Sequence, residues 1–221
     1  MFEGYRVKGL IFDLYNTIID IDTDESDLAT YQTVSKWLMY QGVMIAPERL
    51  KSEYAIRIEE KMGSSKVKYP EIRVEEIFSS ICKDHSIWDI DNHELGIETA
   101  RVFRSASLRR LELFPRSHQL IKDNPHLKKC VLSNGQRVFS ELEMRFLGIY
   151  EYFDLVIFSS DIRYKKPNPK IYHFALNKMQ LKPDEVLFIG DTPENDIIAP
   201  KRMGMKAIHI NEAWEHMSDT L

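Results

Sequence analysis

Polar groups that can act on a phosphoryl group stand close behind short apolar runs of the sequence. They are the carboxylates of Asp13 and Asp191, the hydroxyl of Ser133, the amide of Asn134 and an ammonium from Lys165 or Lys166. A carboxylate can attack phosphorus to form an aspartyl phosphate, and a lysine can neutralise the charge that this step develops. Two carboxylates also supply the hard oxygen ligands that Mg²⁺ prefers. The set therefore predicts the handling of phosphate together with a hard cation.

The elements that must position these groups are predicted from the apolar pattern. The runs lack clean alternation with polar residues, which is typical of parallel strands covered on both faces. Five such runs are predicted strands: 7–12, 130–132, 155–158, 186–189 and 207–210. Three helical patterns separate the later strands: 137–147, 169–179 and 194–203, with Asn168 as the N-cap of the second. The alternation predicts an α/β fold with a doubly wound parallel sheet, in which ligands bind at the carboxyl edge.

Residues 21–107 carry four helical stripes and no convincing strand. We interpret the stripes as core packing. The chain is then divided into a catalytic core, 1–20 and 108–221, and an all-helical domain inserted at 21–107. An acidic run between Asp20 and Asp27 lacks the glycine and the glutamate that an EF-hand loop requires, so it is predicted to be a solvated hinge.

Composition limits the possible partners and the location. The 221 residues carry 30 lysines and arginines against 34 aspartates and glutamates, and this net charge of −4 argues against a nucleic-acid partner bound by a broad basic surface. A hydrophobic fraction of 43% with 29% charged residues is typical of a globular protein and argues against a membrane protein. Only two cysteines, and a start at residues 1–6 without a long apolar stretch, favour the cytoplasm. The oligomeric state stays open.

Four motifs, taken together and in order, carry a family resemblance. They are Phe12–Thr17, Leu132–Gly135, Lys166–Pro169 and Gly190–Asp196. In order and spacing they resemble the four motifs of the haloacid dehalogenase-like (HAD) hydrolases. The resemblance implies a Rossmann-like core, and it makes the helical insertion similar to the α-helical cap of that superfamily. It also implies Mg²⁺-dependent hydrolysis of a small phosphorylated metabolite through an aspartyl phosphate.

The resemblance also implies a role for each motif residue. Asp13 corresponds to the nucleophile, which is also a Mg²⁺ ligand together with Asp191. The backbone carbonyl of Tyr15 would be a further metal ligand, and Asp196 would support the metal ligands from the second coordination shell. Ser133 and Asn134 would bind the phosphoryl group, and Thr17 would support the loop. Lys166, rather than Lys165, corresponds to the motif lysine. The resemblance also implies that Tyr15 and Thr17 belong to the substrate-binding residues.

One departure from the family pattern concerns Tyr15. Phosphatases of this superfamily usually carry an aspartate at that position, which protonates the leaving group. A tyrosine there is similar to the 2-haloacid dehalogenases, in which the nucleophile attacks carbon without a metal. However, the last motif is of the metal-binding type, and no arginine that could bind halide occurs between Asp13 and Glu48. We expect a phosphatase, with a 2-haloacid dehalogenase and a low-turnover binding or regulatory protein as alternatives.

Overall fold

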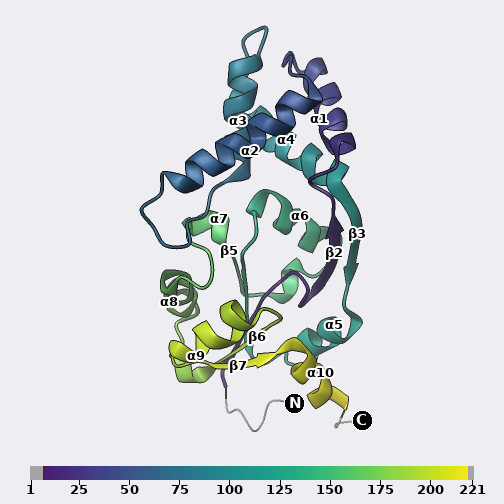
Figure 1. Ribbon diagram of the computed structural model, residues 1–221. Helices are drawn as coiled ribbons and strands as arrows, with labels where there is room; N and C mark the ends of the chain where they lie inside the picture. The colour runs from purple at the N-terminus through teal and green to yellow at the C-terminus, as the bar shows by residue number, and fades with distance from the viewer. Residues whose placement is uncertain (1–6, 219–221) are drawn as a thin grey trace.

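The protein is built around a five-stranded parallel sheet with a helical insertion above it (Figure 1). The structure is a computed structural model that describes residues 7–218, so residues 1–6, considered above for a secretory leader, lie outside it. The strand order is β5-β4-β1-β6-β7. The strands are β1 (Gly9–Phe12), β4 (Lys128–Ser133), β5 (Leu155–Phe158), β6 (Val186–Gly190) and β7 (Lys206–His209). All five predicted strands and the doubly wound α/β class are therefore confirmed.

Both faces of the sheet are buried, as the unbroken apolar runs predict. In the central strand β1, Leu10 and Phe12 pack into one apolar cluster, and Ile11 packs into another on the opposite face. The first cluster includes residues of α5 (Pro115–Lys122), α6 (Arg137–Phe146) and α10 (Ile210–Ser218). The second includes residues of α8 (Pro169–Met179) and α9 (Ala199–Arg202). The remaining short elements are η2 (Tyr150–Tyr152), α7 (Ser159–Ile162), η3 (Pro183–Glu185) and η4 (Pro193–Ile198).

The predicted helices next to the candidate site form, with one difference. Asn168 caps α8 as expected, because its side chain accepts a hydrogen bond from the backbone N–H of Lys170 at 3.1 Å. The expected single helix at 194–203 is instead a π-helical segment, η4, followed by the short α9. Within this segment the side chain of Asp196 accepts the backbone N–H of Thr192 at 3.0 Å.

The four helical stripes form the helical insert, which we define as α1 to α4. These helices are α1 (Leu28–Tyr40), α2 (Pro47–Gly63), α3 (Val74–His85) and α4 (Asn92–Ser107). They bury an apolar cluster of their own, in which the rings of Tyr54 and Phe78 stack with centroids 4.9 Å apart. Phe139 of α6 belongs to the same cluster. The insert is thus packed on α6 as well as connected to the sheet by the chain.

The expectation that residues 21–107 contain no strand is wrong for residues 21–23, and the start of the acidic run, expected to be a solvated hinge, is part of a strand. β2 (Ile19–Thr23) and β3 (Leu108–Leu113) form an antiparallel ribbon that joins the sheet region to the insert (Figure 1). The apolar side chains of the ribbon pack against the core of the sheet, and Asp20 on the other side pairs with Arg110 at 2.7 Å. This alternation of apolar and charged residues is the period of a half-buried strand.

Neither cysteine forms a disulfide in the part of the chain that the structure describes. Cys82 and Cys130 are buried free thiols, and burial raises the pKa of both. Both side chains therefore behave as apolar packing groups rather than as nucleophiles.

Among residues 7–218, no helix is both long and apolar enough to cross a membrane.

Two helical glycines provide a matched test of the packing inside the insert. A Cβ at Gly96 in α4 would lie 2.6 Å from the backbone oxygen of Glu75 in α3, whereas a Cβ at Gly63 would meet nothing within 4 Å. We expect Gly96→Ala to lower the free energy of unfolding by about 1–3 kcal/mol through overpacking. Gly63→Ala should leave it unchanged or raise it by about 0.5–1 kcal/mol, because alanine favours helix. Urea unfolding measures both, and equal stability of the two variants would contradict the close crossing of α3 and α4.

Candidate active site

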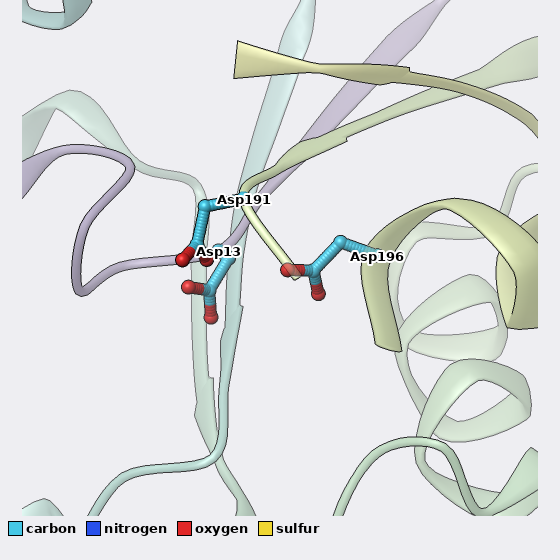
Figure 2. A group of neighbouring side chains, drawn as sticks. All are labelled: Asp13, Asp191 and Asp196. Atoms are coloured by element: carbon cyan, nitrogen blue, oxygen red, sulfur yellow. The ribbon is translucent and has the colours of Figure 1, made fainter. Parts of the chain in front are cut away.

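The carboxyl edge of the sheet brings the predicted site residues together. Asp13 follows β1, Ser133 ends β4 and Asp191 follows β6, and β1 lies between β4 and β6. Asp196 reaches the same place from η4. Carboxylate oxygens of Asp13, Asp191 and Asp196 all lie within 4.8 Å of one another. Figure 2 shows Asp13 and Asp191 side by side, with Asp196 directed toward them from the adjacent helical segment.

Lys166 is buried between two of these carboxylates. Its Nζ lies 2.7 Å from Asp13 Oδ1 and 2.7 Å from Asp196 Oδ1, and the residue is only 4% exposed. The neighbouring Lys165 instead donates its backbone N–H to the carbonyl of Tyr69 at 3.1 Å. Of the two adjacent lysines, Lys166 is therefore the one that contacts the acidic cluster.

Burial and the attraction of oppositely charged neighbours shift the pKa values of these groups in opposite directions. Burial raises the pKa of Asp13 to about 6, and the neighbouring Asp196 adds to this, while Lys166 opposes it. For Lys166, burial alone would lower the pKa, but the attraction of Asp13 and Asp196 outweighs burial and raises it. The ammonium therefore stays charged at neutral pH and favours the ionised form of Asp13.

Asn134 holds Lys166 in place rather than pointing freely into solvent. Its Oδ1 accepts the backbone N–H of Lys166 at 2.7 Å, and its Nδ2 donates to the backbone carbonyl of Lys166 at 3.0 Å. Ser133 is buried directly before it at the end of β4. The motif after β4 and the motif that carries Lys166 are thus joined by a two-point contact that the sequence does not predict.

The acidic cluster fits a divalent cation. Three carboxylates and one ammonium leave two negative charges uncompensated at a largely buried site. All three donors are carboxylate oxygens, the ligand type that suits Mg²⁺. Lys166 bonds only one oxygen of Asp13, and its bonds do not involve Asp191. Asp13 and Asp191 therefore retain oxygens that can bind a metal.

The side chain of Tyr15 is engaged away from the acidic cluster. Its hydroxyl donates to Glu143 Oε2 and lies 2.7 Å from Ser140 Oγ, both on α6. Burial, reinforced by the charge of Glu143, raises the pKa of Tyr15 well above its ordinary value, so the phenol stays neutral. Thr17, two residues on, is fully buried, and its backbone carbonyl accepts the Ser117 hydroxyl at 2.5 Å.

Glu143 and Arg104 adjoin Tyr15 and are not among the residues predicted from the sequence. Arg104 in the last turn of α4 pairs with Glu143, its Nε lying 2.9 Å from Glu143 Oε1. A usable signal exists for Glu143, because this carboxylate stands on the buried stripe of α6 next to Met144 and one turn after Phe139. No comparable signal marks Arg104, whose partner lies far away in the sequence.

Comparison with known proteins gives a family match over most of the chain. The profile of a family described as haloacid dehalogenase-like hydrolase matches residues 7–204. A solved structure of 2-haloacid dehalogenase from Pseudomonas syringae pv. tomato DC3000 superposes with a TM-score of 0.65 at 22% identity. This likeness covers 92% of the present chain and 86% of that structure, and it shows a shared fold.

Two curated phosphatases are also similar in sequence. The glyceraldehyde 3-phosphate phosphatase of Methanothermobacter thermautotrophicus is 35% identical over 81 residues, but the match spans only 37% of this chain and 36% of that protein. The phosphoglycolate phosphatase of Yersinia pseudotuberculosis is 26% identical over 98% of this chain and 86% of its own length.

The buried position of Lys166 can be tested without any substrate. Lys166→Met leaves the acidic cluster without its ammonium, and removing one partner of a buried ion pair typically costs about 3–5 kcal/mol. We expect that loss of unfolding free energy at pH 7 in chelator, and a smaller loss in Mg²⁺, because the cation replaces part of the missing charge. Lys165→Met is the matched control and should change little. Urea unfolding with and without Mg²⁺ measures this, and equal effects of the two substitutions would contradict the site as described.

Proposed function

Because the chain belongs to the haloacid dehalogenase-like hydrolase family, we propose that it is a Mg²⁺-dependent phosphatase of a small phosphorylated metabolite. The observation that carries the proposal is the buried cluster of Asp13, Asp191, Asp196 and Lys166 at the carboxyl edge of the sheet. The curated relatives named above support the substrate class, since both are phosphatases of small metabolites.

The reaction that we propose proceeds in two displacements at phosphorus. A carboxylate oxygen of Asp13 attacks phosphorus, the bond to the leaving oxygen breaks, and Asp13 becomes an aspartyl phosphate. Water then attacks the phosphorus, which restores the carboxylate and releases inorganic phosphate. Lys166 keeps Asp13 ionised before the first step and offsets charge on the transferring group.

The other motif residues have supporting roles in this proposal. Bound by Asp13, Asp191 and the backbone carbonyl of Tyr15, Mg²⁺ would supply positive charge to the phosphoryl oxygens. Ser133 and Asn134 contact the phosphoryl group, and Asn134 in addition positions Lys166. Thr17 supports the loop after Asp13.

We further propose that the inserted residues 21–107 act as a cap over a catalytic core of 1–20 and 108–221. The antiparallel ribbon of β2 and β3 supports this, because it is the connection through which the insert reaches the sheet. A cap that seats on the core excludes water from the reacting atoms and contacts the variable part of the substrate. The chemistry and the substrate selection would then reside in different parts of the chain.

The metal requirement is the first test. We expect hydrolysis of p-nitrophenyl phosphate to disappear in chelator and to return with Mg²⁺, and Asp13→Asn to abolish it because the attacking charge is gone. The control is Asp123→Asn, which changes an exposed aspartate after α5 and should leave activity intact. An unchanged circular dichroism spectrum shows that the variants fold. Chelator-resistant release of halide from 2-chloropropionate would instead establish the dehalogenase alternative, which Tyr15 favours.

The leaving group provides the second test. The Tyr15 proton is held by Glu143, so we expect no efficient proton transfer from Tyr15 to a departing alkoxide. A positioned general acid is typically worth about 10²–10⁴-fold, so the enzyme should prefer aryl phosphates to alkyl phosphates by a factor in this range. Tyr15→Phe removes only the hydroxyl and should keep the ratio of kcat/KM for the two substrates.

Two outcomes of the leaving-group test would change the assignment. A ratio that shifts strongly in Tyr15→Phe would mean that the phenol does donate a proton. Equal rates on aryl and alkyl phosphates in the wild-type protein would point to another acid, and slow turnover of every phosphate tested would favour the binding or regulatory alternative.

A further inference from the structure

We propose that Arg104 is a positioning residue that couples the seating of the helical insert to the loop after Asp13, through Glu143 and Tyr15. The inference rests on the proposed function, because it assigns Asp13 to the reacting centre. It concerns a side chain of the insert that touches neither the acidic cluster nor Lys166 in the contacts described above, so its action is indirect.

Arg104 crosses from the insert to the core. It stands in the last turn of α4, and its side chain is 15% exposed. The guanidinium carbon lies 4.6 Å from the ring centroid of Phe139, which α6 contributes to the core of the insert, and 6.0 Å from that of Tyr15. Its Nη1 also donates to Glu25 at 3.2 Å. The side chain is therefore fixed by contacts on both sides of the boundary.

Glu143 connects Arg104 to Tyr15. Its side chain is 6% exposed, Oε1 lies 2.9 Å from Arg104 Nε in an ion pair without hydrogen-bond geometry, and Oε2 accepts the Tyr15 hydroxyl. A buried carboxylate is tolerated when it is paired and hydrogen-bonded. Loss of Arg104 would leave this charge compensated by hydrogen bonding alone, and the arrangement around Tyr15 would have to change.

Tyr15 in turn lies against the parts that hold the phosphoryl group in the proposal. It is two residues after Asp13, and a Cβ at Gly135 would lie 3.5 Å from Tyr15 Cε2. The ring is thus bounded by α6 and by Gly135 in the loop after β4, next to Ser133 and Asn134. A displaced Tyr15 would disturb both the loop after Asp13 and this neighbouring loop, and displacements of about 1 Å can cost about 10²-fold in rate.

This ion pair differs from the others that join the insert to the core. The pairs Arg109–Asp27 and Arg163–Glu76 have side chains that are between 30% and 45% exposed. Exposed ion pairs of this kind contribute little to the free energy of folding. The Arg104–Glu143 pair is the more buried one and adjoins Tyr15, so it is the one that links the position of the insert to the site.

The experiment compares Arg104→Met, Arg104→Lys, Glu143→Gln and the double variant Arg104→Met/Glu143→Gln with the control Arg101→Met. Arg101 is an exposed arginine one turn earlier on the same helix. Steady-state hydrolysis of p-nitrophenyl phosphate in Mg²⁺ gives kcat and KM. Amide hydrogen exchange over residues 14–19 reports on the loop after Asp13 independently of any turnover.

We expect Arg104→Met to lower kcat by about 10- to 100-fold with KM changed less than about threefold, and to accelerate exchange over residues 14–19. Arg104→Lys should recover part of kcat, because it restores the charge without the planar fork. The double variant should lose less than the two single losses combined, because it removes the stranded carboxylate as well. Arg101→Met should match the wild type.

Two results would overturn the coupling. One is an Arg104→Met protein that equals Arg101→Met in both kcat and exchange, and the other is losses in kcat that simply multiply in the double variant. If Arg104→Met does not fold, the lysine variant and the double variant decide the question by the same two measurements. Absence of phosphate release from the wild-type protein would refute the proposed function instead, and the exchange data would still decide whether Arg104 orders the loop.

Discussion

The burial of the Lys166 ammonium between Asp13 and Asp196 is the constraint on which the rest of the structure depends. Taking these charges out of water is costly, and the cost is offset only when the partners are held at hydrogen-bonding distance. The structure meets this requirement with two contacts of 2.7 Å. The rigid central strands fix Asp13, and the turn of η4 fixes Asp196 through the backbone of Thr192. The same arrangement leaves an excess of negative charge, which would favour the binding of a divalent cation at this place.

The loop that carries Lys166 is held by the helical insert as well as by the core. Asn168 donates its side-chain amide to the carbonyl of Lys68 at 2.7 Å, and Ser159 donates its hydroxyl to Glu71 Oε2 at 2.5 Å. Lys68 and Glu71 both belong to the segment between α2 and α3. The insert therefore contacts the core on two sides, at this loop and at Glu143. A change in the seating of the insert would reach Lys166 from one side and Tyr15 from the other.

The sequence predicts the parts of this structure that depend on local pattern. The five buried strands, the four helices of the insert and the cap at Asn168 follow from apolar periodicity and helix-end chemistry, and the strand ends predict which polar residues meet. The β2–β3 ribbon was predictable in principle, because Ile19-Asp20-Ile21-Asp22 alternates, but its acidic residues suggested a loop. The clamp of Asn134 on Lys166 and the pairing of Arg104 with Glu143 join residues that are about 30 to 40 positions apart. Such contacts arise from tertiary packing, for which a single sequence carries no periodic signal.

Tyr15 is consistent with this site because of what surrounds it. Glu143 is a buried carboxylate whose Oε2 needs a donor, and a neutral phenol supplies one. An ionised aspartate at position 15 has no proton to donate, so it would leave that oxygen unsatisfied and bring a second negative charge toward α6. The tyrosine and Glu143 therefore belong together, and the departure from the usual phosphatase pattern extends from one residue to a group that includes Arg104 of the insert. The acidic edge of the sheet is separate from this group, so a carboxylate cluster that could bind a metal and a tyrosine at position 15 occur together in one chain.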